Sequence, residues 1–198
     1  MSTKRRLSSE ESKARAVEEA RTLLIDSGPQ AVTLKAVADR VGRTHANLLH
    51  HFGSAAGLQK ELASHLADTV CASIRAAILQ YRAGDKDPRE VIDMIFDAFD
   101  KEGGGALANW MLASGNMDAI HPIVDEIHKV IDELYPEELS GTPPQMHRVT
   151  YTLCLIALGD ALLGPSLATG LGVERSTSRD HAEQMLMATL ALTGRLKP

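Results

Sequence analysis

The stretch T-L-K-A-V-A-D-R-V-G-R-T-H-A-N-L-L-H-H-F, at residues 33–52, predicts two short helices joined by a tight turn. Thr33 and Thr44 are of the residue type that caps helix N-termini, because a threonine hydroxyl accepts a hydrogen bond from a free backbone N–H of the first turn. Gly42 lies between the two helices and can adopt the positive φ angle of a turn without steric cost. The segment therefore has the pattern of a helix-turn-helix.

The second of these helices has two distinct faces. Its inner face is apolar through Leu48 and Phe52, and Ala38 in the first helix is small enough for the second to cross closely over it. We expect the outer face to present hydrogen-bonding side chains that suit the major groove of DNA, namely Thr44, His45, Asn47 and His50. A helical hairpin of this spacing also occurs in many other α proteins, so the rest of the chain must support the interpretation.

The remaining sequence predicts an all-α fold, because apolar residues recur three and four positions apart and alternating β-branched runs are rare. We expect further helices over about 12–27, 54–81, 88–102, 107–114, 120–135, 143–168 and 178–196, with Ser54 capping the second of these. The run Gly103 to Gly105 indicates a hinge or linker between two helices, and Pro165 indicates a kink.

The 198 residues carry a net charge of −5, which argues against a protein that coats nucleic acid through bulk positive charge. The charge is uneven, because residues 1–65 hold ten Lys or Arg against seven Asp or Glu, whereas residues 66–198 hold eleven against nineteen. Cys71 and Cys154 are too few and too far apart in sequence for a disulfide framework or a thiolate zinc site. We therefore expect a weakly basic N-terminal part, an acidic remainder and a reducing, cytoplasmic environment.

Other functional classes find little support. The sequence has no G-x-S-x-G, P-loop or H-E-x-x-H motif, so we expect no enzymatic activity and no cofactor. His121, Asp125 and His128 have the spacing of metal ligands on one helix face, but this spacing is common by chance, and we expect a solvated polar stripe rather than a metal site. The apolar stretch at residues 153–171 contains Asp160, which favours a buried helix over a membrane span, and no apolar run of a signal peptide follows the basic N-terminus.

From about residue 16 to about residue 67 the sequence resembles the N-terminal domain of the TetR family of transcriptional regulators. The matching positions are Gly28, Thr33, Val37, Ala38, Gly42, Thr44, Leu48, His51, Phe52 and Ser54. The resemblance implies a DNA-binding domain at residues 1–53 and a ligand-binding and dimerisation domain at 54–198. Together with the polar outer face of the second helix, the resemblance predicts DNA contacts from Thr33, Lys35, Arg43, Thr44, His45, Asn47 and His50.

Three positions depart from the family pattern. Arg43 stands where the family usually has an apolar residue, Leu49 replaces the usual tyrosine, and Ala55 replaces the usual lysine. Tyrosine and lysine at these places would hold phosphates, so their loss is expected to weaken affinity for any DNA. Arg43 and the basic arm at residues 4–6 could compensate.

The resemblance also implies a ligand cavity among the later helices. Phe96, Phe99, Trp110 and Met111 gather on two successive predicted helices of a chain with few aromatic residues. These side chains are candidates for lining a pocket that takes a small apolar or amphipathic effector. The alternative is that they form ordinary core.

The helix around residues 153–163 is apolar on every side except at Asp160, so it must be covered on every side. We expect a second copy of the chain to cover one face, with the last helix completing a four-helix bundle about a two-fold axis. The predicted interface residues are Ala157, Ala161, Gly164, Met185, Leu186, Thr189 and Leu192. The alternative is that both helices pack within one subunit.

Taken together, these features predict a homodimeric regulator that binds a double-stranded DNA operator, does not enter a membrane and is a repressor released by its effector. The competing hypothesis is a helical small-molecule or metal-binding protein that keeps the helix-turn-helix as a scaffold and binds DNA weakly.

Overall fold

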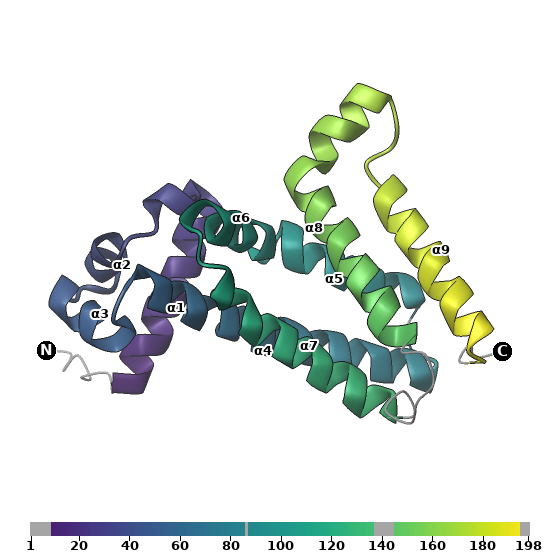
Figure 1. The fold of residues 1–198 in the computed structure, drawn as a ribbon, viewed down its shortest axis with the longest axis horizontal. Helices are drawn as coiled ribbons and strands as arrows, with labels where there is room; N and C mark the ends of the chain where they lie inside the picture. Colours follow the sequence, from purple (N-terminus) through teal and green to yellow (C-terminus); the bar gives the residue numbers. More distant parts are fainter. Residues whose placement is uncertain (1–8, 86, 137–144, 195–198) are drawn as a thin grey trace, which may run out of the picture. The chain divides into compact units, whose positions relative to one another are not determined.

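The structure is a computed structural model that describes residues 9–85, 87–136 and 145–194, and over these residues all of its regular secondary structure is helical (Figure 1). The helices are α1 (Ser9–Ser27), α2 (Leu34–Val41), α3 (His45–Phe52), α4 (Ala55–Ala83), α5 (Pro88–Asp100), α6 (Gly104–Ser114), α7 (His121–Leu134), α8 (Gln145–Leu171) and α9 (Thr177–Leu192). Two 3₁₀ turns, Pro29–Ala31 and Met117–Ile120, precede α2 and α7. The predicted all-α fold is confirmed. The expected start of α8 at Pro143 lies outside the described residues.

The chain divides into two compact units. One contains residues 1–65 and 106–122, and the other contains residues 66–105 and 123–198. The expected functional boundary after residue 53 falls inside the first unit, because the first turns of α4 pack with the N-terminal helices. Leu58 and Leu62 of α4 are fully buried there, and Lys13 of α1 forms an ion pair with Glu61 at 2.8 Å.

The second unit is built around α5, α8 and α9, and α5 contacts both of the others. Its apolar core includes Ile92 and Phe96 of α5, Leu153 of α8 and Leu190 of α9. Asp160, the charged residue expected within the apolar stretch, is buried and pairs with Arg175 in the turn between α8 and α9. The turn thus closes onto α8 and neutralises its buried carboxylate.

The glycine run differs from the prediction of a linker. Gly103 ends the preceding segment with a positive φ of 97°, but Gly104 and Gly105 already belong to α6. A Cβ atom on Gly105 would lie 3.0 Å from the carbonyl oxygen of Phe99 and 3.2 Å from the Cβ of Ala161. The glycines therefore serve close packing at the start of a helix, which sequence spacing alone does not reveal.

Two helices, α4 and α8, are long and apolar enough to cross a membrane by length and composition alone. Core helices of soluble proteins can have the same length and composition. Pro165 lies inside α8, which continues as a helix to Leu171.

Candidate nucleic-acid interface

The local structure of the helix-turn-helix follows from its capping residues. The Thr33 hydroxyl accepts a hydrogen bond from the N–H of Ala36 at 3.0 Å, and the Thr44 hydroxyl accepts one from the N–H of Asn47 at 3.2 Å. Gly42 ends α2 in the left-handed conformation, with φ of 66°. The predicted caps and the predicted turn glycine are therefore confirmed, and the orientation of α3 is fixed at its N-terminus.

The inner faces of these helices form a small core. Leu48 and Phe52 of α3 are buried, as the sequence predicted, and Val37 and Ala38 of α2 are buried with them. At the next corner the Ser54 hydroxyl accepts a hydrogen bond from the N–H of Gly57 at 3.1 Å, so the predicted cap of α4 is also present.

Gly57 makes this corner possible. A Cβ atom at this position would lie 1.9 Å from the carbonyl oxygen of Phe52, a distance that no side chain tolerates. The turn between α3 and α4 is therefore tight, and it fixes the direction in which the chain leaves α3.

Most of the predicted DNA contacts are accessible. The exposed members of the set are Thr33, Lys35, Arg43, Thr44, His45 and His50. Asn47 differs, because it is half-buried and its Oδ1 atom is buried without a hydrogen-bond partner among the described residues. It lies at the flank of the exposed face of α3 rather than at its centre.

Arg43 is attached to the first helix. Its Nε donates a hydrogen bond to the Oγ of Ser12 at 3.3 Å, while its backbone N–H donates to the carbonyl of Ala38 at 2.9 Å. The residue as a whole remains exposed. The basic arm at residues 4–6 lies outside the described residues.

Sequence reasoning missed two residues on the outer face of α3. Ala46 and Leu49 are exposed alongside His45 and His50, and the exposed fraction of Leu49 is 44%. The signal was present in the helical spacing, because residues 45, 46, 49 and 50 share one side of a helix with 3.6 residues per turn.

This arrangement of two capped helices, a left-handed glycine turn and an exposed polar rim defines a helix-turn-helix domain of the DNA-binding class. Residues 16–62 match the model of the family described as bacterial regulatory proteins, tetR family. The match agrees with the family that the residue pattern of this segment suggested.

Solved structures support the same fold over almost the whole chain. A protein of Mesorhizobium loti MAFF303099, described as a TetR-family transcriptional regulator, has a TM-score of 0.63 at 13% identity and covers 94% of this chain and 98% of its own. A TetR-family regulator from Streptomyces coelicolor has a TM-score of 0.60 at 20% identity and covers 95% and 82%. A third, from Rhodococcus sp., has a TM-score of 0.57 at 14% identity and covers 91% and 99%. No curated protein matches the sequence.

The predicted effector-binding residues are distributed over both units. Phe96 and Phe99 lie on α5 in the second unit, whereas Trp110 and Met111 lie on α6 in the first. All but Phe99, which is half-buried, are buried. Their joint role in a pocket remains a prediction.

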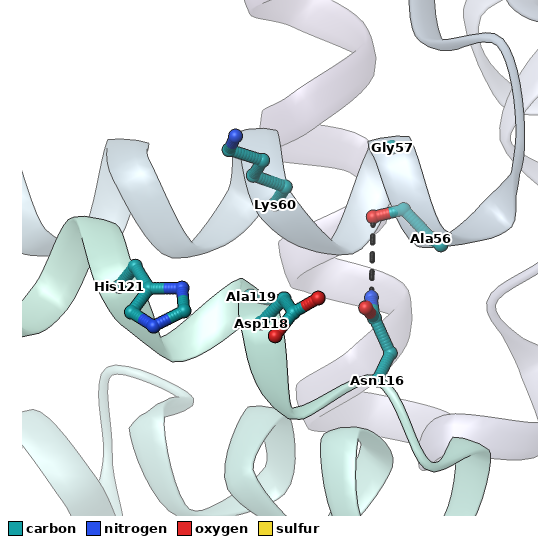
Figure 2. Close-up of a pocket in the computed structure, with 7 residues that line it drawn as sticks. All are labelled: Ala56, Gly57, Lys60, Asn116, Asp118, Ala119 and His121. Carbon is teal, nitrogen blue, oxygen red and sulfur yellow. Dashed lines mark hydrogen bonds between the residues drawn. The ribbon is translucent and has the colours of Figure 1, made fainter.

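A different hollow lies within the first unit, between the start of α4 and the turn before α7 (Figure 2). Its volume is about 480 Å³, and it is lined by Ala56, Gly57, Lys60, Asn116, Asp118, Ala119 and His121. None of the four predicted effector residues lines it. Charged and polar groups surround it, which does not suit a purely apolar molecule.

A hydrogen-bond network around the buried Gln59 side chain lies beside this hollow. Gln59 of α4 donates from Nε2 to the Oγ of Ser114 at 3.0 Å, and it accepts at Oε1 from the Nδ2 of Asn116 at 2.6 Å. Asn116 Nδ2 also donates a hydrogen bond to the carbonyl oxygen of Ala56 at 3.4 Å. The dashed line in Figure 2 marks this bond. The network ties the end of α6 to the first turns of α4.

The predicted dimer residues differ in their accessibility. Ala157 and Leu186 are buried in the core of their own unit, so they are not available to a partner. Ala161, Gly164, Met185 and Thr189 are half-buried, and Leu192 is 90% exposed. The apolar side chains that α8 does expose are Tyr151, Leu155, Leu162, Leu163, Leu167 and Leu171.

The described residues contain no group of three His, Cys, Asp or Glu residues that could hold a metal ion. The ring of His128 instead lies 5.2 Å from the ring of His147 on α8, measured between centroids. His147 Nε2 in turn lies 3.5 Å from Asp132 Oδ1.

Proposed function

We propose that this protein is a homodimeric transcriptional repressor of the cytoplasm that binds a double-stranded DNA operator and leaves it when a small apolar or amphipathic effector binds. The observation that carries the proposal is the outer face of α3, where Thr44, His45 and His50 are exposed on a helix held by a threonine cap and a left-handed glycine. These side chains have the donors and acceptors that read base edges in the major groove.

Two further observations support the proposal. Residues 1–65 carry more basic than acidic groups, although the whole chain is acidic, so the DNA-binding segment does not repel phosphates. The exposed leucines of α8 give a second copy an apolar surface to cover. A symmetric dimer would then place two recognition helices about 34–36 Å apart, one turn of B-DNA.

In this mechanism the effector acts by shifting a population between two conformations. The effector-bound conformation holds α4 so that the two copies of α3 no longer match successive major grooves. Because the coupling is reciprocal, DNA must weaken effector binding by the same factor that the effector weakens DNA binding.

The test is a fluorescence anisotropy titration with the DNA upstream of the protein's own gene and with a scrambled duplex of equal length. We expect the wild-type protein to bind the upstream DNA more tightly than the scrambled duplex. His50→Ala should weaken binding to the upstream DNA by about 1–3 kcal/mol and leave the affinity for the scrambled duplex unchanged. Equal binding of wild-type protein to both duplexes would favour the competing scaffold hypothesis.

Effector release needs a separate experiment. Trp110 is the single tryptophan of the chain and is buried, so its emission is expected to change when an apolar compound binds nearby. A compound that changes this emission should also dissociate the DNA complex. A compound that binds while leaving DNA affinity constant would contradict the release mechanism.

A further inference from the structure

The centre of the exposed face of α3 is apolar. Leu49 is 44% exposed, and Ala46 beside it is also exposed, although Leu48 and Phe52 already supply the buried face of this short helix. Neither side chain is needed for the core. A leucine in this position exposes apolar surface unless a partner covers it.

Helical geometry makes the two residues neighbours. Positions three apart lie on one face, so Ala46 and Leu49 form a continuous apolar strip. His45 lies four positions before Leu49, and His50 lies four positions after Ala46, which places one imidazole on each side of the strip. The face is therefore an apolar centre with two hydrogen-bonding edges.

The major groove contains one kind of apolar group on its base edges, the 5-methyl group of thymine. Most other groups on the base edges are hydrogen-bond donors or acceptors, and covering them with a leucine side chain would leave them without partners. An apolar strip between two imidazoles thus matches a base step in which thymine methyls stand between polar edges.

We propose that Leu49, supported by Ala46, reads thymine 5-methyl groups in the operator and determines sequence specificity at those positions. This inference rests on the proposed DNA binding and adds the base that α3 selects. The position where the family usually holds a phosphate with tyrosine becomes, in this chain, a contact to a base.

The experiment uses the full-length protein and the tightest duplex selected from a random pool. Each thymine of the protected region is replaced singly by deoxyuridine, which keeps the base pairing and removes only the methyl group. We expect binding to weaken about three- to five-fold at one or two positions, the loss that corresponds to one buried methyl group.

Leu49→Ala should bind the thymine duplex more weakly and no longer distinguish thymine from deoxyuridine at those positions. Leu112→Ala is the matched control, because Leu112 is an exposed leucine in the same unit but lies on α6. This control should keep both the affinity and the discrimination. Circular dichroism melting of each variant shows that it is folded.

Two results would overturn this inference while leaving the proposed DNA binding intact. In the first, the wild-type protein binds every deoxyuridine duplex as tightly as the thymine duplex. In the second, Leu49→Ala still distinguishes thymine from deoxyuridine as well as the wild-type protein does. Failure of the selection to enrich any duplex would overturn the proposed function together with the inference. The two failures are therefore distinguishable.

Discussion

Arg179 Nη2 of α9 lies 2.7 Å from Asp97 Oδ1 of α5, and this pair joins the two helices in the second unit. The same guanidinium donates to Asp93 Oδ1 at 2.8 Å, and its carbon lies 5.1 Å from the centre of the Phe96 ring. The Arg179 side chain is only 17% exposed. It therefore covers apolar core with its charge paired on two sides, unlike an ordinary surface ion pair.

Arg179→Ala should lower the free energy of unfolding by about 1–3 kcal/mol, because it removes two charge-assisted hydrogen bonds and the contact with the ring. Lys101→Ala is the matched control, since Lys101 Nζ lies 2.7 Å from the same Asp97 carboxylate but its side chain is 65% exposed. The control should cost at most about 0.5–1 kcal/mol. Urea unfolding followed by circular dichroism measures both, and equal losses would contradict the role assigned to Arg179.

Stability should also fall in acid. Burial acts to raise the pKa of Asp97, but hydrogen bonds from Lys101 and Arg179 outweigh it and hold the pKa below its usual value. The hydrogen bond from Arg89 likewise lowers the pKa of Asp180. A carboxylate whose pKa is lower in the folded state stabilises the protein fully at pH values above its pKa in the unfolded chain, about 3.9. This stabilisation is lost as the pH falls through the pKa of the folded state.

Thermal melting in steps from pH 6 to pH 3 measures this loss. We expect the melting temperature to fall below about pH 4 and to fall less steeply in Asp97→Asn, which has no carboxylate to protonate there. Parallel curves for the two proteins would show that Asp97 does not contribute to the acid dependence.

Gln59→Ala should destabilise the protein by about 1–3 kcal/mol, because Gln59 is buried and its removal leaves Asn116 Nδ2 without its shortest partner. Lys60→Ala, the next residue and exposed, should change stability by at most about 0.5 kcal/mol. Chemical unfolding of the two variants separates these outcomes. A Gln59→Ala protein as stable as wild type would show that the network contributes little.

Arg43→Ala should weaken binding to specific and scrambled DNA alike and reduce the slope of log K against log salt by about one, if its guanidinium contacts a phosphate. Ser12→Ala is a suitable control, because it removes the hydrogen bond to Arg43 Nε and leaves the charge in place. Anisotropy titrations between about 50 and 200 mM salt give the slopes. A slope that falls equally in both variants would mean that the orientation set by Ser12 matters as much as the charge.

The features that sequence alone predicted are those that depend on near neighbours along the chain. Thr33, Gly42 and Thr44 act on atoms within a few residues, so their residue types specify the turn. The glycines of α6 were misread because the atoms that require them, on Phe99 and Ala161, belong to other helices. The burial of Ala157 was likewise invisible, because helical spacing shows that a residue is apolar but does not show which neighbour covers it.

The last prediction concerns the dimer. Ala157 is unsuited to testing it, because a charge at a buried position would unfold the unit. Leu163 on α8 is 59% exposed. We expect Leu163→Glu to give monomers that no longer bind an operator with two half-sites. A dimer interface of about 2,000 Å² does not tolerate a buried, unpaired carboxylate. Leu79→Glu is the matched control, since Leu79 of α4 is 49% exposed in the same unit, and it should remain dimeric. Sedimentation velocity at micromolar concentration distinguishes the dimer from the 21.3 kDa chain. A wild-type protein that sediments as the single chain would contradict the dimer and the paired spacing of its recognition helices.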